Sequence, residues 1–385
     1  MARASRSRTM GSARASASCG VRGVVRYAVV GLGHIAQAAI LPAFAHARRN
    51  SRLTALLSDD PAKLKALGRK YKVAGRYSYD EYDKALAEVD AVFIALPNSM
   101  HADYTVWAAQ RGVHVLCEKP MAVTVEECER MIEACDTAGV KLMIAYRLHF
   151  EPLNLAAVAA VRRGALGDLK YFISDFSMRV RDGNIRTDPA LGGGTLYDIG
   201  VYCINAARYL FGADPLEVSA VSVNSGAAPT RDIDESTASI LRFEGGRVAA
   251  FVTSFNAADV ASYRIVGTKG HMRLDPAYEY SEPLGATLTV GERTTRMRGK
   301  KHDQFAAELL YFSDCILRNR QPEPSGLEGL QDVAIVQALV ESADIGRVVR
   351  IPERPSDRRP QPDQRIVRPP VGKVKLVKAR SAHKE

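Results

Sequence analysis

The chain has 385 residues, of which 46% are hydrophobic and 25% are charged, a composition typical of a soluble protein with two globular domains. It contains no run of about 18 apolar residues, so no membrane-spanning helix is expected. The formal net charge of +10 comes from the two ends: residues 1–26 carry six arginines and no acidic residue, and residues 353–385 carry ten basic and four acidic residues. Since the body of the chain is nearly neutral, the charge argues against a nucleic-acid-binding domain.

Both ends are predicted to be disordered basic tails, over residues 1–23 and 352–385, and neither is expected to contribute to catalysis. The first lacks the apolar segment of a signal peptide, and the second is rich in proline and charge. The six cysteines show no CxxC spacing and mostly fall in apolar segments, which predicts reduced, buried thiols and no metal site. These features favour a cytoplasmic protein.

Residues 24–148 are predicted to form an α/β Rossmann-type domain that binds NAD(P). Short apolar runs alternate with helical patterns, as in βαβ units whose strands are covered on both faces. The predicted strands span residues 26–30, 53–57, 91–96, 114–117 and 141–145. The predicted helices span residues 34–47, 62–71, 102–111 and 125–138.

Residues 149–351 are predicted to form an α+β domain with a large, mostly antiparallel open sheet, for substrate binding and oligomerisation. The predicted strands span residues 170–179, 238–243, 247–254 and 263–267, with helices over 195–211, 303–318 and 328–345. An open sheet exposes a face that isolated monomers rarely leave bare, which predicts a homodimer or homotetramer.

The first predicted strand leads directly into Gly31-Leu32-Gly33-His34-Ile35-Ala36, a G-x-G-x-x-A motif at the start of a helix. Gly31 allows a tight turn, and Gly33 lets the backbone approach a pyrophosphate at the positive end of the helix. The motif predicts that the residues from Gly31 to Ile35 bind a dinucleotide.

The tip of the second strand selects between NAD and NADP, because an acidic residue there binds the ribose hydroxyls of NAD and repels the 2′-phosphate of NADP. Ser58 occupies the place where that acid is expected, and Lys63 lies one turn into the next helix, within reach of a phosphate. Asp59 and Asp60 are interpreted as caps of that helix. NADP is therefore the favoured cofactor, while Asp59 keeps NAD open.

Cys117-Glu118-Lys119-Pro120 follows a buried strand at the carboxyl edge of the sheet, where ligands of open α/β sheets bind. A lysine there can polarise a hydroxyl or a carbonyl and favour the ionised form of a neighbouring acid or base. The proline indicates a special turn, for which a cis peptide is one possibility.

Three glycines at 192–194 precede a helical pattern that carries Asp198 and Tyr202. Because these two residues are four apart, they share one face of the helix. Tyr202 offers a phenol that can take the proton of a sugar hydroxyl, and Asp198 can orient the same substrate. Lys119, Asp198 and Tyr202 are the predicted catalytic residues, and Arg186 is added as a substrate-binding residue.

With these motifs the chain resembles the Gfo/Idh/MocA oxidoreductases from about Arg26 to Pro352, and within them the glucose-fructose oxidoreductase subgroup, which carries a tyrosine where many relatives have histidine at 202. The resemblance implies Lys119 and Tyr202 in catalysis with Asp198 assisting, and Ser58, Lys63 and Tyr79 at the 2′-phosphate. The remaining expected cofactor contacts are Leu96, Pro97, Asn98, His101, Glu118, Lys119 and Arg147. Arg147 and His149 are both expected to face the cleft. Ile185 stands where relatives often have tryptophan, so an aromatic sugar platform is not expected there.

The predicted function is hydride transfer between nicotinamide and either C1 of an aldose, giving a lactone, or a keto sugar. A catalytically silent regulator that senses dinucleotide or sugar on the same fold is the alternative. The intact set of Lys119, Asp198 and Tyr202 favours the enzyme, because a sensor does not need proton-transfer groups.

Overall fold

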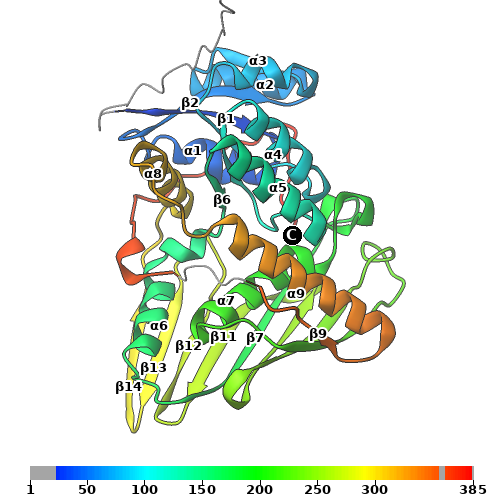
Figure 1. The fold of residues 1–385 in the computed structure, drawn as a ribbon, viewed down its shortest axis with the longest axis vertical. Coiled ribbons are helices and arrows are strands. Elements are labelled where there is room, and N and C mark those ends of the chain that lie inside the picture. Colours follow the sequence, from blue (N-terminus) through cyan, green and yellow to red (C-terminus); the bar gives the residue numbers. More distant parts are fainter. Residues whose placement is uncertain (1–22, 355–359, 384–385) are drawn as a thin grey trace, which may run out of the picture.

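The computed structural model describes residues 23–354 and 360–383, and it divides into an upper and a lower domain in Figure 1. The upper domain is built on a six-stranded, fully parallel sheet with the order β3-β2-β1-β4-β5-β6. Its strands are β1 Val25–Val30, β2 Ser51–Leu57, β3 Gly75–Tyr77, β4 Ala91–Ile94, β5 His114–Cys117 and β6 Leu142–Ile144. The apolar runs predicted as strands form this sheet because both of its faces are covered.

The crossover helices of this domain begin and end at recognisable signals. They are α1 Leu41–Ala43, α2 Pro61–Tyr71, α3 Tyr82–Leu86, α4 His101–Gln110 and α5 Val125–Ala138. Thr124 and Glu127 form a capping box at the start of α5, and Gly139 ends it in the left-handed conformation. The helix that starts at His34 is shorter than predicted, because it widens into a π-helical stretch over Ala36–Ile40 and stops at Ala43.

The lower domain is a nine-stranded sheet with the order β14-β13-β12-β11-β7-β10-β9-β8-β15, in which only the β10–β7 pair is parallel. Its strands are β7 Leu169–Arg179, β8 Glu217–Val223, β9 Ser236–Phe243, β10 Arg247–Ser254, β11 Asn256–Gly267, β12 Gly270–Leu274, β13 Gly285–Val290, β14 Arg293–Arg298 and β15 Val349–Arg350. Its helices are α6 Pro152–Arg162, α7 Val201–Phe211 and α9 Gly326–Ile345. The predicted fold class is confirmed.

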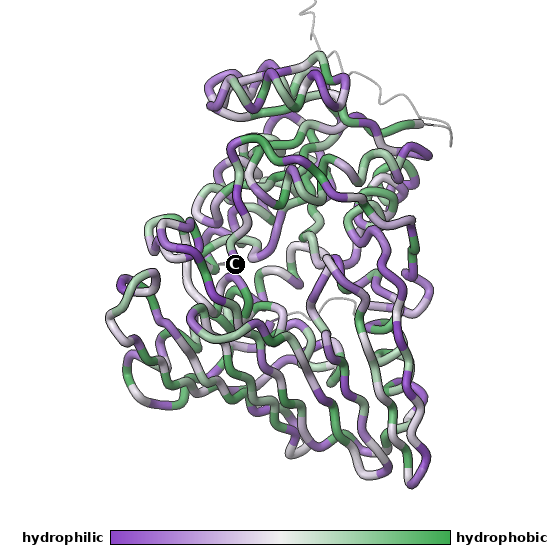
Figure 2. Tube along the Cα trace, turned by 180° about the vertical axis from the view of Figure 1, so that it is seen from behind, coloured by the Kyte–Doolittle hydropathy of each residue, from purple (hydrophilic) through white to green (hydrophobic). Residues whose placement is uncertain are grey.

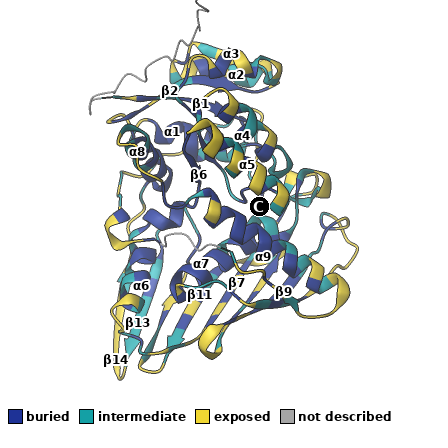
Figure 3. Ribbon diagram, viewed as in Figure 1, coloured by how far each residue is buried: buried dark blue, intermediate teal, exposed yellow. Residues whose placement is uncertain are grey.

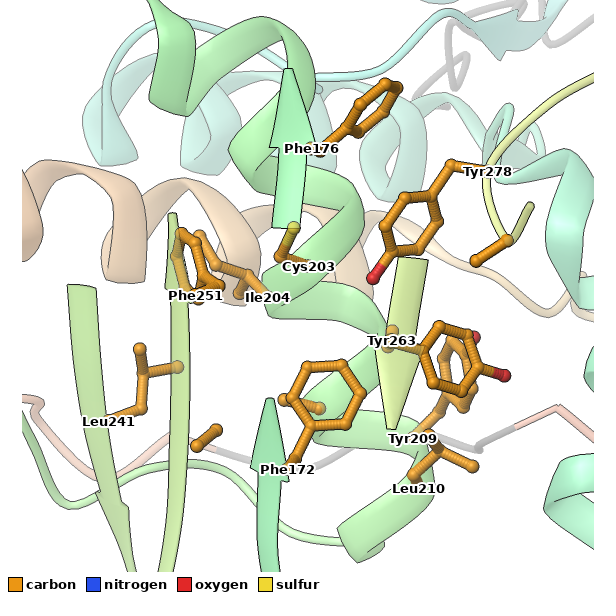
Figure 4. Packing of buried hydrophobic residues seen from close by; sticks show 14 of the residues in the cluster. Phe172, Phe176, Cys203, Ile204, Tyr209, Leu210, Leu241, Phe251, Tyr263 and Tyr278 are labelled. Atoms are coloured by element: carbon orange, nitrogen blue, oxygen red, sulfur yellow. The ribbon is translucent and has the colours of Figure 1, made fainter. Parts of the chain in front are cut away.

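Helix α7 packs on one face of the large sheet and forms the core of the lower domain. Cys203, Ile204 and Leu210 of the helix meet aromatic side chains of the strands, among them Phe172 and Phe251 (Figure 4). Buried and exposed residues alternate along the strands (Figure 3), and no helix within residues 23–354 and 360–383 covers the opposite face of the sheet. This packing fixes α7 and the site residues just before it.

Two helices differ from the prediction. Helix α6 was missed, although Glu151 caps it and Pro152 occupies its first turn. Helix α8, Gln304–Leu317, falls in the second domain by sequence, yet its apolar face packs against the core of the first domain, beside β1. The chain therefore returns to the Rossmann domain after the second sheet. A single boundary at residue 148 does not divide the whole chain into two domains, because α8 belongs to the first domain by its packing.

The prediction of a disordered tail from residue 352 is wrong for residues 360–383, which pack along both domains. The backbone N–H of Asp303 donates to the carbonyl of Arg368, and Gln364 donates to the carbonyl of Glu323. Proline and charge indicated disorder, but this segment is held by backbone and amide hydrogen bonds that leave no periodic pattern in a sequence. Of the N-terminal tail predicted over residues 1–23, residues 1–22 lie outside the described residues.

Two further expectations concern thiols and membranes. Cys117, Cys128, Cys135, Cys203 and Cys315 are free and buried, while Cys19 lies outside the described residues. Within residues 23–354 and 360–383, no helix is long and apolar enough to cross a bilayer.

Candidate active site

A cavity of about 520 Å³ lies between the two domains. It is lined by the loop after β1, by the carboxyl ends of β4 and β5, by β7 and the start of α7, and by Lys378–His383. The predicted site residues that line it are Gly33, His34, Ile35, Lys63, Leu96, Pro97, Asn98, His101, Glu118, Lys119, Arg147, Arg186, Asp198 and Tyr202. Gly31, Leu32, Ser58 and Tyr79 are not among the lining residues.

The loop after β1 has the shape that a dinucleotide requires. Gly31 has φ +93°, and a Cβ there would lie 2.4 Å from the carbonyl oxygen of Ala95, so glycine is needed for the turn. A Cβ on Gly33 would meet nothing within 4 Å, which leaves the backbone open toward the cavity. Burial, with a smaller contribution from Arg186 and His383, lowers the pKa of the neighbouring His34. Because the backbone at Gly33 is open, an anion can approach the helix start closely.

At the tip of β2 both acidic residues accept hydrogen bonds from backbone N–H groups of the protein. Asp60 accepts hydrogen bonds from the backbone of Ala62 and Lys63 as the cap of α2, as interpreted, while Asp59 accepts one from the backbone N–H of Tyr79 at 3.0 Å. Ser58 is buried and its hydroxyl accepts from the backbone of Asp60. Lys63 alone of these residues lines the cavity.

The loop after β4 lies beside the loop that carries Gly31 and also contacts the second domain. Asn98 donates to the carbonyl of Gly192 at 2.8 Å, and a Cβ on Gly192 would lie 2.9 Å from that of Asn98, so the glycine permits this contact between domains. His101 is fully buried, with its ring nitrogens 2.9 Å and 3.0 Å from the carbonyl oxygens of Pro120 and Leu96. His101 thus holds two loops together at the edge of the cavity.

Lys119 and Asp198 meet across the domain boundary. The Lys119–Pro120 peptide is cis, the possibility that the sequence left open. Lys119 Nζ donates to the backbone carbonyl of Asp198 at 2.6 Å and to its Oδ1 at 3.2 Å, and Arg186 Nε donates to Oδ2 at 2.7 Å. Burial raises the pKa of Asp198, but Arg186 and Lys119 outweigh it and hold the pKa at about 2. Asp198 is therefore an ionised acceptor at neutral pH and a weak base.

The Tyr202 phenol lies between two cations. Lys119 Nζ is 4.8 Å from the centroid of its ring, and Arg147 Nη2 donates to its hydroxyl oxygen at 3.2 Å. Arg147 is buried and anchored by Gln304 and by the backbone carbonyl of Tyr278. The sequence placed Arg147 at the cofactor and missed its contact with Tyr202, because nothing in a sequence links the end of β6 to α7.

Aromatic side chains form a wall that the sequence did not predict. Phe176 of β7, Tyr278 and Tyr280 line the cavity, and the Phe176 and Tyr278 rings are stacked with centroids 5.1 Å apart. Tyr202 packs against both of these rings. An aromatic surface of this kind suits the apolar face of a sugar ring, and it comes from β7 and from the loop between β12 and β13 rather than from position 185.

His149 does not face the cavity, which corrects the expectation. It is fully buried, with Nδ1 2.7 Å from Glu323 Oε1 and Nε2 2.7 Å from Asn205 Oδ1. It follows Arg147 in a short 3₁₀ turn, so the two side chains point to different sides.

Glu118 carries a carboxyl group that is poorly suited to ionise. Its Oε1 is buried without a hydrogen-bond partner among the described residues, and burial raises its pKa to about 7 against the opposing effect of Lys119 and Arg147. Between pH 4.5, the ordinary pKa of a glutamate, and about 7 the unfolded chain loses this proton while the folded chain keeps it, so folding stability falls as the pH rises.

Replacing Glu118 with Gln should remove this pH dependence. Relative to the parent, Glu118→Gln is expected to gain about 2–3 kcal/mol of unfolding free energy between pH 5 and pH 8. Urea unfolding of both proteins at equal cofactor load, at half-unit pH steps, measures the gain. A constant difference across this range would show that Glu118 ionises in the folded protein as it does in a free chain.

The cavity as a whole fits a nicotinamide dinucleotide at one end and a small polyol at the other. Gly33, the helix start and Lys63 offer the phosphate-binding groups, while Lys119, Asp198 and Tyr202 lie at the far end beside the aromatic wall. No group of three His, Cys, Asp or Glu side chains in the described part of the chain could hold a metal ion.

Comparison with known proteins supports the division of the chain into a dinucleotide-binding domain and a second domain. A family model described as "Oxidoreductase family, NAD-binding Rossmann fold" matches residues 25–146, and a "GFO/IDH/MocA C-terminal domain" model matches residues 154–273. The chain is 31% identical over 333 residues to the D-xylose 1-dehydrogenase (NADP(+)) 2 of Haloferax volcanii, covering 84% of this chain and 99% of the relative.

Two solved structures are similar over most of the chain. The aldose-aldose oxidoreductase of Caulobacter crescentus, complexed with glycerol, has 39% identity and a TM-score of 0.81, with 85% of this chain and 99% of the other covered. A 3-ketoreductase of Actinomadura kijaniata, in complex with NADP and TDP-benzene, has 26% identity and a TM-score of 0.75, with 83% and 98% covered.

Proposed function

The chain belongs to the Gfo/Idh/MocA oxidoreductase family, as its motifs indicated, and we propose that it transfers hydride between NADP and a sugar, with C1 of an aldose as the oxidised carbon. The observation that carries the proposal is the convergence of Lys119, Asp198 and Tyr202 in one cavity with the dinucleotide loop. Two of the similar proteins are named for aldoses, which supports the substrate class. A silent regulator is the less favoured candidate, because all three proton-transfer groups are in contact.

Tyr202 and Asp198 have different roles in the proposed reaction. Oxidation of a hydroxyl group to a carbonyl removes a hydride from carbon and a proton from oxygen, and bound NADP accepts the hydride. Tyr202 takes the proton, because its hydroxyl lines the cavity and accepts a hydrogen bond from Arg147, while Lys119 lies over its ring. Asp198 accepts a hydrogen bond from a sugar hydroxyl and orients it, since its low pKa makes it a poor proton acceptor.

The preference for NADP over NAD rests on Lys63 and on the acidic residues of the β2 tip. Asp60 is occupied as a helix cap and Asp59 as a partner of the Tyr79 backbone, so neither is free to bind ribose hydroxyls without giving up that contact. Lys63 is the charged residue of this tip that lines the cavity.

A panel of aldoses, assayed with NADP and with NAD by nicotinamide absorbance, tests the proposed function. Oxidation of at least one aldose, with a higher kcat/KM for NADP, is the expected result. Binding of NADP without turnover of any aldose or keto sugar would favour the regulator, and equal use of NAD would point to Asp59 as a ribose ligand.

We also propose that the chain forms a homodimer or homotetramer through the face of the large sheet that carries no helix. Apolar side chains on this face are exposed, and Ile173, Ala250 and Ile240 lie side by side across β7, β10 and β9. Figure 2 shows the alternation of apolar and polar residues along these strands. A continuous apolar row of this kind is typical of a buried interface.

Replacing Ile240 with Lys should lower the molecular mass in solution, because it places a charge in the middle of that row. Light scattering at micromolar concentration measures the mass, and Ile345→Lys is the matched control, since Ile345 is 52% exposed against 50% for Ile240 and lies at the end of α9. A parent protein that is already monomeric would refute the proposal. The cytoplasmic location expected from the sequence stays a prediction.

A further inference from the structure

Residues 376–383, which we name the C-terminal strap, cross from one domain to the other beside the cavity. At the first domain, the side-chain amide of Gln37 accepts from the backbone N–H of Val377 at 2.7 Å and donates to its carbonyl at 2.9 Å. At the second domain, the backbone N–H and the Nε of Arg181 donate to the carbonyls of Ala382 and His383 at 2.8 Å and 2.6 Å. Figure 1 shows the C-terminal end at the level where the two domains meet.

The strap covers the cavity and does not fill it. Lys378, Ala379, Arg380, Ser381, Ala382 and His383 line a space of about 520 Å³ whose other walls include Gly33 and Lys63. Ala382 is buried, and Val377 packs against the core of the Rossmann domain. The backbone is therefore anchored on both sides while open space remains beneath it.

The strap brings positive charge to the dinucleotide end of the cavity. Lys378 Nζ lies 3.2 Å from Asp60 Oδ2, at the cap of the helix that carries Lys63. Arg380 is exposed, lines the cavity and forms no ion pair with any described residue. Gln37, which holds Val377, also donates to the carbonyl of Leu32 in the glycine loop, so this part of the strap lies beside the expected pyrophosphate site.

We propose that the C-terminal strap is part of the dinucleotide-binding site, in which it closes the groove over bound NADP while Lys378 and Arg380 contact the cofactor phosphates. The inference rests on the proposed use of NADP. Because the strap is bonded to both domains, the cofactor leaves only after these contacts open, so the strap slows its release. Partial neutralisation of Lys378 by Asp60 leaves Arg380 as the stronger phosphate contact.

The dissociation rate of NADPH, followed by its fluorescence on displacement with excess NADP, tests this proposal on the full chain and on variants. Deleting residues 376–385 should speed dissociation by at least about tenfold, and Arg380→Ala by several-fold, in line with the loss of charged hydrogen bonds. Lys375→Ala is the matched control, because Lys375 is an exposed cation directly before the strap and does not line the cavity. Dissociation should also depend less on salt in Arg380→Ala than in the parent.

A second measurement does not require the truncated protein to fold. Trypsin cleavage of the full chain after Lys378 and Arg380 should slow at least several-fold when NADP is added, whereas cleavage in the N-terminal tail should not.

The outcomes separate this proposal from the proposed function. A full chain that does not bind NADPH refutes the use of the cofactor. A full chain that binds it, with unchanged dissociation in both the truncation and Arg380→Ala, refutes the strap alone. Tighter binding after truncation would show that the segment occupies the groove and competes with the cofactor.

Discussion

Turnover of the sugar substrate is expected to fall by about 10²–10⁴-fold when Tyr202 is replaced with Phe, while the affinity for NADP stays within a few-fold of the parent. The phenol lines the cavity as the proposed proton acceptor, and a base at this position is assisted by cations beside it. Lys119 and Arg147 provide them, and the phenylalanine ring keeps its packing against Phe176 and Tyr278. The loss should therefore appear in kcat.

Tyr197→Phe is the control for this substitution. Tyr197 lies five residues earlier in the same helical stretch, but its hydroxyl donates to the carbonyl of Val123 and it does not line the cavity. Turnover of this variant should remain within about twofold of the parent, because the lost hydroxyl lies outside the cavity and makes one neutral hydrogen bond. If Tyr202→Phe oxidised the sugar at the parental rate, another group that lines the cavity would have to move the proton.

The residues that sequence reasoning found are those whose chemistry follows from local pattern. The strand Arg247–Ser254, the helix Val125–Ala138 and the loop after β1 each carry their own signals: alternation, a capping box, and glycines that a turn requires. Lys119 could be placed because the carboxyl ends of parallel strands converge on one edge. These signals predict the Rossmann domain and the three proposed catalytic residues, with no knowledge of the distances between them.

What the sequence could not provide are contacts between distant segments. Arg147 reaches Tyr202 only because α8 supplies Gln304 and the 278–280 loop supplies a carbonyl to hold the guanidinium. His149 follows two residues later and is turned into a buried bond with Glu323. Disorder was predicted for the C-terminal segment, because the contacts that anchor it are hydrogen bonds to its backbone, such as those of the Gln37 amide with Val377, and these do not depend on hydrophobic periodicity.

Lys119→Ala is expected to reduce turnover at least as much as Tyr202→Phe, because Lys119 serves two partners. Its ammonium group lies over the Tyr202 ring and also bonds the backbone and the carboxylate of Asp198. Removing it takes one cation from the phenol and leaves Asp198 with Arg186 as its remaining ion-pair partner among the described residues.

The double variant Lys119→Ala/Tyr202→Phe separates a shared role from two independent ones. If the cation acts through the phenol, the second substitution removes little that the first has left, and the combined loss should be much smaller than the product of the single losses. Lys170→Ala, an exposed lysine at the start of β7, controls for loss of a charge and should keep parental turnover. Single losses that multiply in the double variant would mean that Lys119 acts on the substrate or on Asp198 independently of Tyr202, and that Arg147 alone supports the phenolate.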